Sequence, residues 1–215
     1  MNDNVLQMRQ PKIDRPVLRN FAFCGVRGAG KTYAMMRMLR TRARWVFVDP
    51  KSNAEASIVS YSAERIAATL KAHDVYEIAW HCGHLTPAKM REGLEVITNA
   101  MISNRGTIDT LAIDEVGVLC PKKSITLPDR VMSSARMGRD LGFSIWVASQ
   151  RAVDIHPDVR QLCDGTLVFR QEEQLDVNRL NQVLKGLGEA ARGLKPHFYY
   201  YVSGGKARHM KPMGG

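Results

Sequence analysis

The sequence predicts an α/β fold with a mostly parallel central sheet and helices on both of its faces. Two observations favour this class: short apolar runs alternate with helix-like stretches along most of the 215 residues, and a glycine-rich loop joins the first apolar run to the first helix-like stretch. We expect strands near residues 20–24, 45–49, 76–81, 110–114, 144–149, 166–170 and 197–202. We expect helices over residues 31–42, 62–73, 87–104, 129–141, 154–163 and 174–187.

The first predicted strand is followed by a complete Gly-x-x-x-x-Gly-Lys-Thr phosphate loop. Its three glycines let successive backbone N–H groups point toward a triphosphate, and the start of the next helix adds the positive end of its dipole. Lys31 would reach the β- and γ-phosphates, while the Thr32 hydroxyl would hold Mg²⁺. The loop therefore predicts ATP and Mg²⁺ as cofactors, although ATP and GTP are not distinguished. The predicted nucleotide-binding residues of this segment are Gly25, Val26, Arg27, Gly28, Ala29, Gly30, Lys31, Thr32 and Tyr33.

Hydrolysis needs a second set of groups, and two later strands end in suitable residues. Asp114 and Glu115 follow the apolar run Thr110–Ile113, which places two carboxylates at the carboxyl end of a buried strand. Asp114 suits the role of holding Mg²⁺ through water beside the nucleotide, and Glu115 can polarise the attacking water. Gln150 ends the next apolar strand, where its amide could bind both this water and the γ-phosphate. The glutamate beside the aspartate favours water as the nucleophile that attacks the γ-phosphate. The alternative is a kinase, in which a small molecule accepts the phosphate.

The order of four features resembles the HerA/FtsK superfamily of DNA-pumping ATPases. These features are the Asp49-Pro50-Lys51 turn, the Asp114-Glu115 pair, the run Arg139-Asp140-Leu141-Gly142 and the ending Ser149-Gln150-Arg151. The resemblance covers most of residues 20–170, and it implies a RecA-like P-loop NTPase with ATP hydrolase activity.

The same resemblance implies that Arg139 acts in a neighbouring subunit's site as a catalytic residue, beside Lys31, Glu115 and Gln150. Such an arginine neutralises charge during γ-phosphate transfer and can be worth about 10³ to 10⁵ in rate. Three other arginines compete for the role: Arg136, Arg151 and Arg160.

Length and charge indicate which branch of this superfamily the chain resembles. The chain divides into a basic N-terminal arm (1–18), a P-loop ATPase domain (19–203) and a mobile basic C-terminal tail (204–215). We expect no integral membrane segment, because no stretch approaches the roughly 18 consecutive apolar residues of a membrane span. The chain has 31 Lys and Arg against 21 Asp and Glu, a net charge of +10. This balance favours double-stranded DNA as a partner, bound through its backbone without sequence readout.

A compact member without an anchor resembles the single-domain genome-packaging ATPase of tailless, internal-membrane viruses with double jelly-roll capsids. The resemblance implies a homo-oligomeric ring, a hexamer or pentamer, that packages double-stranded DNA into a preformed capsid. Its partners would be capsid or portal-vertex proteins. It would act at the packaging vertex of the virion and lie in the host cytoplasm during assembly. The alternatives are a conjugative or Zot-like DNA-transfer ATPase and a virion scaffold that nucleotide stabilises.

Three further features leave alternatives open. The loop 116–128 either links the nucleotide to DNA or is a passive surface loop. His81-Cys82-Gly83-His84 contains zinc-ligand types but lacks the second cluster that a closed site needs. Tyr199-Tyr200-Tyr201 either stacks on single-stranded bases or belongs to an edge strand.

Overall fold

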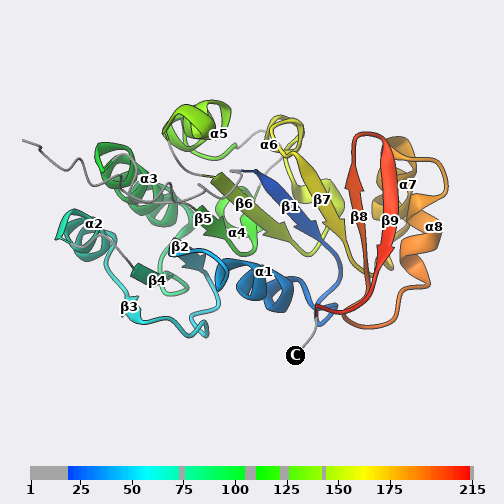
Figure 1. Ribbon diagram of the computed structural model, residues 1–215, viewed down its shortest axis with the longest axis horizontal. Coiled ribbons are helices and arrows are strands. Elements are labelled where there is room, and N and C mark those ends of the chain that lie inside the picture. The colour runs from blue at the N-terminus through cyan, green and yellow to red at the C-terminus, as the bar shows by residue number, and fades with distance from the viewer. Residues whose placement is uncertain (1–18, 73–75, 105–109, 122–125, 142–143, 214–215) are drawn as a thin grey trace, which may run out of the picture.

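A twisted central sheet runs the length of the molecule (Figure 1). The computed structural model describes residues 19–72, 76–104, 110–121, 126–141 and 144–213, so the predicted arm at 1–18 lies outside the described part. Within these ranges the sheet has nine strands in the order β3-β4-β2-β5-β6-β1-β7-β8-β9. The strands are β1 (Phe21–Cys24), β2 (Arg44–Asp49), β3 (Ile58–Ser60), β4 (Tyr76–His81), β5 (Thr110–Ile113), β6 (Ser144–Ser149), β7 (Gly165–Val168), β8 (Tyr199–Ser203) and β9 (Lys206–Met210).

Strands β3 to β7 of this order pair in parallel, and the last two pairings are antiparallel. The central strands β1, β5 and β6 are buried at every position, as expected for parallel strands covered on both faces. The mostly parallel α/β sheet predicted from the alternation of elements is thus confirmed.

Helices cover both faces of the sheet, but unequally (Figure 1). One face packs on α1, whose Met35 and Leu39 join a cluster with Phe23, Phe47 and Trp146. The other face forms the larger cluster, to which the remaining helices contribute. The helices are α1 (Lys31–Leu39), α2 (Ala63–Ala72), α3 (Pro87–Ser103), α4 (Val116–Leu119), α5 (Asp129–Leu141), α6 (Pro157–Gln161), α7 (Gln174–Val183) and α8 (Leu187–Arg192), with a 3₁₀ turn at Ala152–Asp154. None of the described helices is long and apolar enough to cross a membrane.

Several predicted helices differ from those observed. The helix expected over 154–163 divides, because Pro157 starts α6 with His156 as its N-cap. The helix expected over 174–187 ends at Val183, and α8 follows Gly186, which adopts a left-handed φ of 79°. The predicted loop 116–128 contains α4, and β3 was not predicted because three residues carry too little periodicity.

The C-terminal end also differs from its prediction. We expected a mobile tail from residue 204, yet Lys206–Met210 forms β9 and pairs antiparallel with β8. Gly204 and Gly205 have φ values of 55° and 70°, and two consecutive left-handed residues are what a two-residue hairpin turn requires. The expectation of an edge strand at Tyr199–Tyr201 was therefore wrong, since β9 lies outside β8.

Candidate functional site

The phosphate loop has the left-handed backbone that its glycines permit. Gly28 and Gly30 adopt left-handed φ values of 75° and 104°. A Cβ on Gly25 would lie 2.6 Å from the Cβ of Phe169, so a side chain has no room there. Gly30 is the N-cap residue of α1 and provides no side-chain cap. The N–H groups of the first helical turn therefore remain available to an anion.

Lys31 lies across this loop. It is buried, and its Nζ donates to the carbonyl oxygens of Gly25 at 2.6 Å and Val26 at 3.0 Å. Burial lowers the pKa of Lys31, while the nearby charges of Glu115 and Asp114 oppose this shift. The ammonium is thus held close to the carboxylates, where a triphosphate would lie between the two.

The predicted acidic pair lies directly beside the loop. Thr32 Oγ1 donates to Asp114 Oδ2 at 3.1 Å, joining the two motifs across 82 residues of sequence. Glu115 has a left-handed φ of 57°, and its Oε1 accepts the backbone N–H of Gln150 at 3.1 Å. Asp114, Glu115 and Gln150 therefore meet at the carboxyl ends of β5 and β6.

The same carboxylates suit a divalent cation. Asp114 Oδ1 and Glu115 Oε2 are buried without a hydrogen-bond partner, which is costly unless a cation or water binds them. Carboxylate and hydroxyl oxygens are ligands that Mg²⁺ accepts together with phosphate. Thr32 and Asp114, the predicted Mg²⁺ residues, fit this chemistry.

Lys51 is a member of the site to which the sequence assigned no role. Its Nζ lies 2.7 Å from Asp114 Oδ2 and 4.0 Å from Glu115 Oε2. The turn that carries it is fixed by Asp49, whose carboxylate accepts N–H groups from Lys51, Asn53 and Ala54 at 2.7–2.9 Å. The signal lay in the Asp-Pro-Lys turn, but locating Lys51 required knowing that β2 neighbours β5.

The arginines that are candidates for acting in a neighbouring subunit's site, called trans arginines here, differ in their surroundings. Arg139 belongs to α5, but its side chain lies outside the described part of the chain. Arg151 is bound within its own subunit, because its Nε lies 3.2 Å from Asp176 Oδ2 and this contact raises its pKa. Arg136 is exposed on α5, and Arg160 is partly buried.

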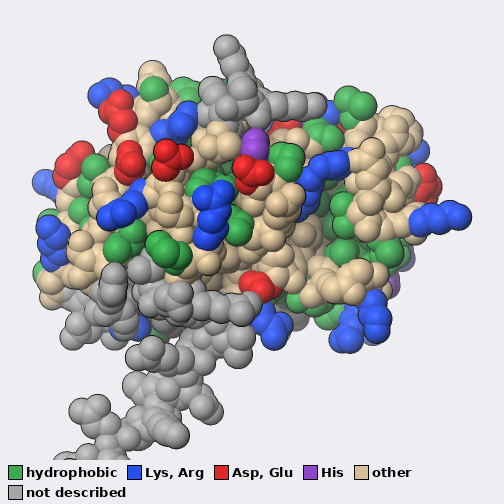
Figure 2. Space-filling view, turned by 90° about the horizontal axis from the view of Figure 1, so that it is seen from above, with side chains coloured by type: hydrophobic (Ala, Val, Ile, Leu, Met, Phe, Trp, Pro, Cys, Tyr) green, Lys and Arg blue, Asp and Glu red, His purple; other side chains and the backbone are tan. Residues whose placement is uncertain are grey.

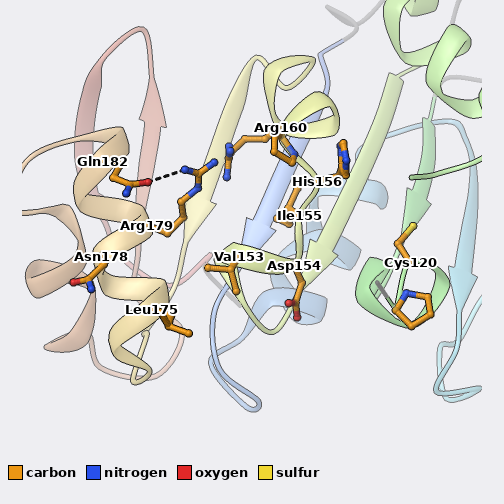
Figure 3. Close-up of a pocket in the computed structure, with 12 residues that line it drawn as sticks. Cys120, Val153, Asp154, Ile155, His156, Arg160, Leu175, Asn178, Arg179 and Gln182 are labelled. Carbon is orange, nitrogen blue, oxygen red and sulfur yellow. Dashed lines mark hydrogen bonds between the residues drawn. The ribbon is translucent and has the colours of Figure 1, made fainter. Parts of the chain in front are cut away.

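Arg160 lines a cavity of about 610 Å³ between α6, α7 and the segment after β6 (Figure 3). Its guanidinium points toward that of Arg179, which donates to Gln182 at 2.7 Å. Burial, and then the charge of Arg179, lowers the pKa of Arg160. No residue of the phosphate loop lines this cavity.

The remaining sequence features do not join the site. His81 Nε2 lies 3.0 Å from the Ala54 carbonyl oxygen, and burial raises the pKa of Cys82 to about 12. Within the described ranges, no group of three His, Cys, Asp or Glu side chains is placed to hold a metal ion.

Seen from above, Lys and Arg side chains are interspersed with Asp and Glu over this face (Figure 2). That view identifies no single basic patch.

The sheet, the loop and the acidic pair together define an α/β P-loop NTPase fold. Comparison with solved structures agrees. The genome packaging NTPase B204 from Sulfolobus turreted icosahedral virus 2, in complex with sulfate, is similar with a TM-score of 0.73 and 16% identity over 91% of this chain and 97% of that one. Its complex with ATP-gammaS gives a TM-score of 0.71 at 14% identity, with 91% and 98% covered.

VirB4 of Thermoanaerobacter pseudethanolicus is similar as well. Its TM-score is 0.67 at 11% identity, over 91% of this chain and 89% of that chain. No protein-family model and no curated protein matches the sequence. At these identities the likeness shows a shared fold.

Proposed function

We propose that this protein hydrolyses ATP and uses the energy to move double-stranded DNA. The observation that carries the proposal is the hydrogen bond from Thr32 to Asp114, with Glu115 beside it. It brings a phosphate-binding loop and a pair of buried carboxylates to one point, which nucleotide binding alone does not need.

Each residue has a distinct task in the proposed reaction. The loop N–H groups and Lys31 would bind the phosphates and balance their charge, and Lys31 is already placed over the loop. Glu115 would accept a proton from the attacking water, and Gln150 would orient that water from the next strand. Mg²⁺ would supply positive charge to the β- and γ-phosphate oxygens.

Hydrolysis can be tested with one substitution and a matched control. Glu115→Gln keeps the shape of the side chain but removes the base, so turnover should fall about 10²- to 10⁴-fold while ATP still binds. Glu95→Gln, an exposed change on α3, should leave turnover unchanged. Rates are measured with and without double-stranded DNA. Equal rates for wild type and Glu115→Gln would discard the catalytic assignment.

The substrate to be moved is inferred from charge and from likeness of fold. A net charge of +10 favours contacts with phosphate backbones. The similarity to a genome packaging NTPase supports packaging of viral DNA into a preformed capsid at a vertex, with capsid or portal proteins as partners. Stimulation of ATP hydrolysis by DNA supports translocation. Slow turnover that ignores DNA, with a stable nucleotide-bound oligomer, would instead support a scaffold.

A DNA-transfer ATPase is the second candidate, and the likeness to VirB4 favours it. Binding to purified portal or capsid proteins is the distinguishing measurement. Packaging requires such a complex, whereas DNA transfer requires a membrane-bound partner.

We also propose a ring of identical subunits in which Arg139 completes the neighbouring site. Arg151 is the weaker candidate, because Asp176 already binds it within the subunit. Arg139→Ala should lose turnover, and mixing it with Glu115→Gln subunits, which keep Arg139, should restore part of it. Failure of mixing at every ratio would mean that Arg139 acts within its own subunit or is not the catalytic arginine.

A further inference from the structure

Two aromatic side chains lie together at the start of α1. Tyr33 follows Thr32 directly and is 43% exposed. The ring of His197 lies 5.5 Å from that of Tyr33 at an interplanar angle of 84°, an edge-to-face arrangement. Both side chains thus border the phosphate loop but are open to solvent.

His197 comes from the far end of the chain and is attached to the loop itself. Its N–H donates to the Ala29 carbonyl at 3.0 Å. A Cβ on Gly30 would lie 2.7 Å from His197 Nδ1, so the imidazole packs directly on the loop backbone. The backbone of His197 is left-handed, with φ 67°, which is uncommon for a residue other than glycine.

The order of the strands determines where a nucleoside would lie. Asp114, Glu115 and Gln150 follow β5 and β6, on one side of β1, and they mark the γ-phosphate end. The phosphate chain must then run away from β5, so the nucleoside leaves the loop on the opposite side. That side belongs to β7 and β8 (Figure 1). His197 comes just before β8 in the sequence.

The aromatic rings of Tyr33 and His197 are suited to binding a nucleobase. A purine has flat π faces, and aromatic side chains bind such faces by stacking without reading the edges. Tyr33 also reaches the C-terminal segment, where its hydroxyl lies 3.5 Å from the Met213 carbonyl oxygen. From sequence, Tyr33 is predicted to bind nucleotide only as the end of the phosphate loop, and no local pattern assigns a role to His197.

We propose that Tyr33 and His197 form the nucleobase subsite of this protein, in which the base of a nucleoside triphosphate stacks on the face of one ring and meets the perpendicular ring at its edge. The inference rests on the proposed function, since it requires that the loop binds such a nucleotide. Stacking gives the subsite no means to separate adenine from guanine, so ATP and GTP should bind with similar affinity.

The test compares a nucleotide with a probe that lacks a base. Calorimetry measures the affinity of the full chain for a non-hydrolysable ATP analogue and for inorganic tripolyphosphate, both with Mg²⁺. Tyr33→Ala and His197→Asn should each lower the affinity for the ATP analogue by roughly 5- to 150-fold, the range expected when one aromatic contact with a base is lost. Tripolyphosphate affinity should not change. Asparagine is chosen because it tolerates the left-handed backbone and so keeps the loop contact.

Two control variants distinguish loss of the contact with the base from a general folding defect. Tyr33→Phe keeps the ring and should keep the analogue affinity. Tyr61→Ala removes an exposed ring that contacts His81 and His84 beside β4, and should change neither affinity.

The affinities for the two probes distinguish failure of the nucleobase subsite from failure of the proposed ATPase function. A wild type that binds both probes equally, or variants that lose both together, would overturn the base subsite and leave the phosphate site standing. A wild type that binds neither probe would overturn the proposed function itself.

Discussion

The phosphate-loop end of the sheet and the cavity between α6 and α7 both hold cationic side chains, but the partners of these cations differ. At the loop, Lys31 binds backbone carbonyls and Lys51 lies on Asp114. In the cavity, Arg160 and Arg179 point at each other (Figure 3). The cavity is spacious, but Asp154 is the one acidic side chain among its described lining residues.

Arranged charge, more than cavity volume, therefore distinguishes the end of the sheet where we propose that nucleotide binds. Buried charges are expensive unless paired, so a chain that keeps Lys31, Asp114 and Glu115 together must gain something from them. Substitutions at the two regions should therefore differ in size of effect.

Lys31→Ala should have the largest effect. It removes the cation that the loop holds over the phosphate position, and losing one preorganised donor typically costs about 10²- to 10³-fold in turnover. Nucleotide affinity should fall as well. ATP hydrolysis and calorimetry measure the two effects. Intact affinity together with intact turnover would contradict the whole interpretation of the site.

Asp176→Ala should mainly reduce stability. Asp176 is 1% exposed, accepts the N–H of Val153 at 3.0 Å and pairs with Arg151, so the change leaves these donors without their acceptor. We expect a loss of about 1–3 kcal/mol in the free energy of unfolding, measured by urea denaturation. Asp158→Ala, an exposed change on α6, is the control. Equal stability of the two variants would show that the segment after β6 does not depend on this contact.

Lys51→Met should have a smaller effect that nucleotide reverses. It removes the ammonium beside Asp114 and Glu115, whose negative charges then repel each other in the free protein. The melting temperature should fall without ligand, and Mg²⁺ with nucleotide should recover more of it than in wild type. A variant that melts like wild type without ligand would show that Lys51 does not balance these carboxylates. Lys51→Arg keeps the charge and is the control.

Arg160→Ala should have the smallest effect. Its partly buried guanidinium has a repulsive neighbour in Arg179, so its removal relieves this repulsion, and we expect a stability change of no more than about 1 kcal/mol. Turnover should remain near wild type. A large loss of turnover that mixing restores would instead assign the trans role to Arg160.

Much of the fold and of the site was predictable because its signals are local. The phosphate loop, the buried strand before Asp114 and the strand before Gln150 are each contained in a few consecutive residues. The hairpin of β8 and β9 was also local, but consecutive Gly204 and Gly205 were interpreted as the start of a mobile tail. The two-residue turn they allow was the better interpretation.

Local sequence patterns were enough to predict alternating strands and helices, a phosphate loop after β1 and acids after β5. The contacts of Lys51 with Asp114 and of His197 with Ala29 depend on the fold. Each of these contacts joins strand ends whose neighbourhood depends on the order of strands in the sheet. Sequence spacing carries no record of that order, because parallel strands are linked by crossovers and pair according to how their faces pack.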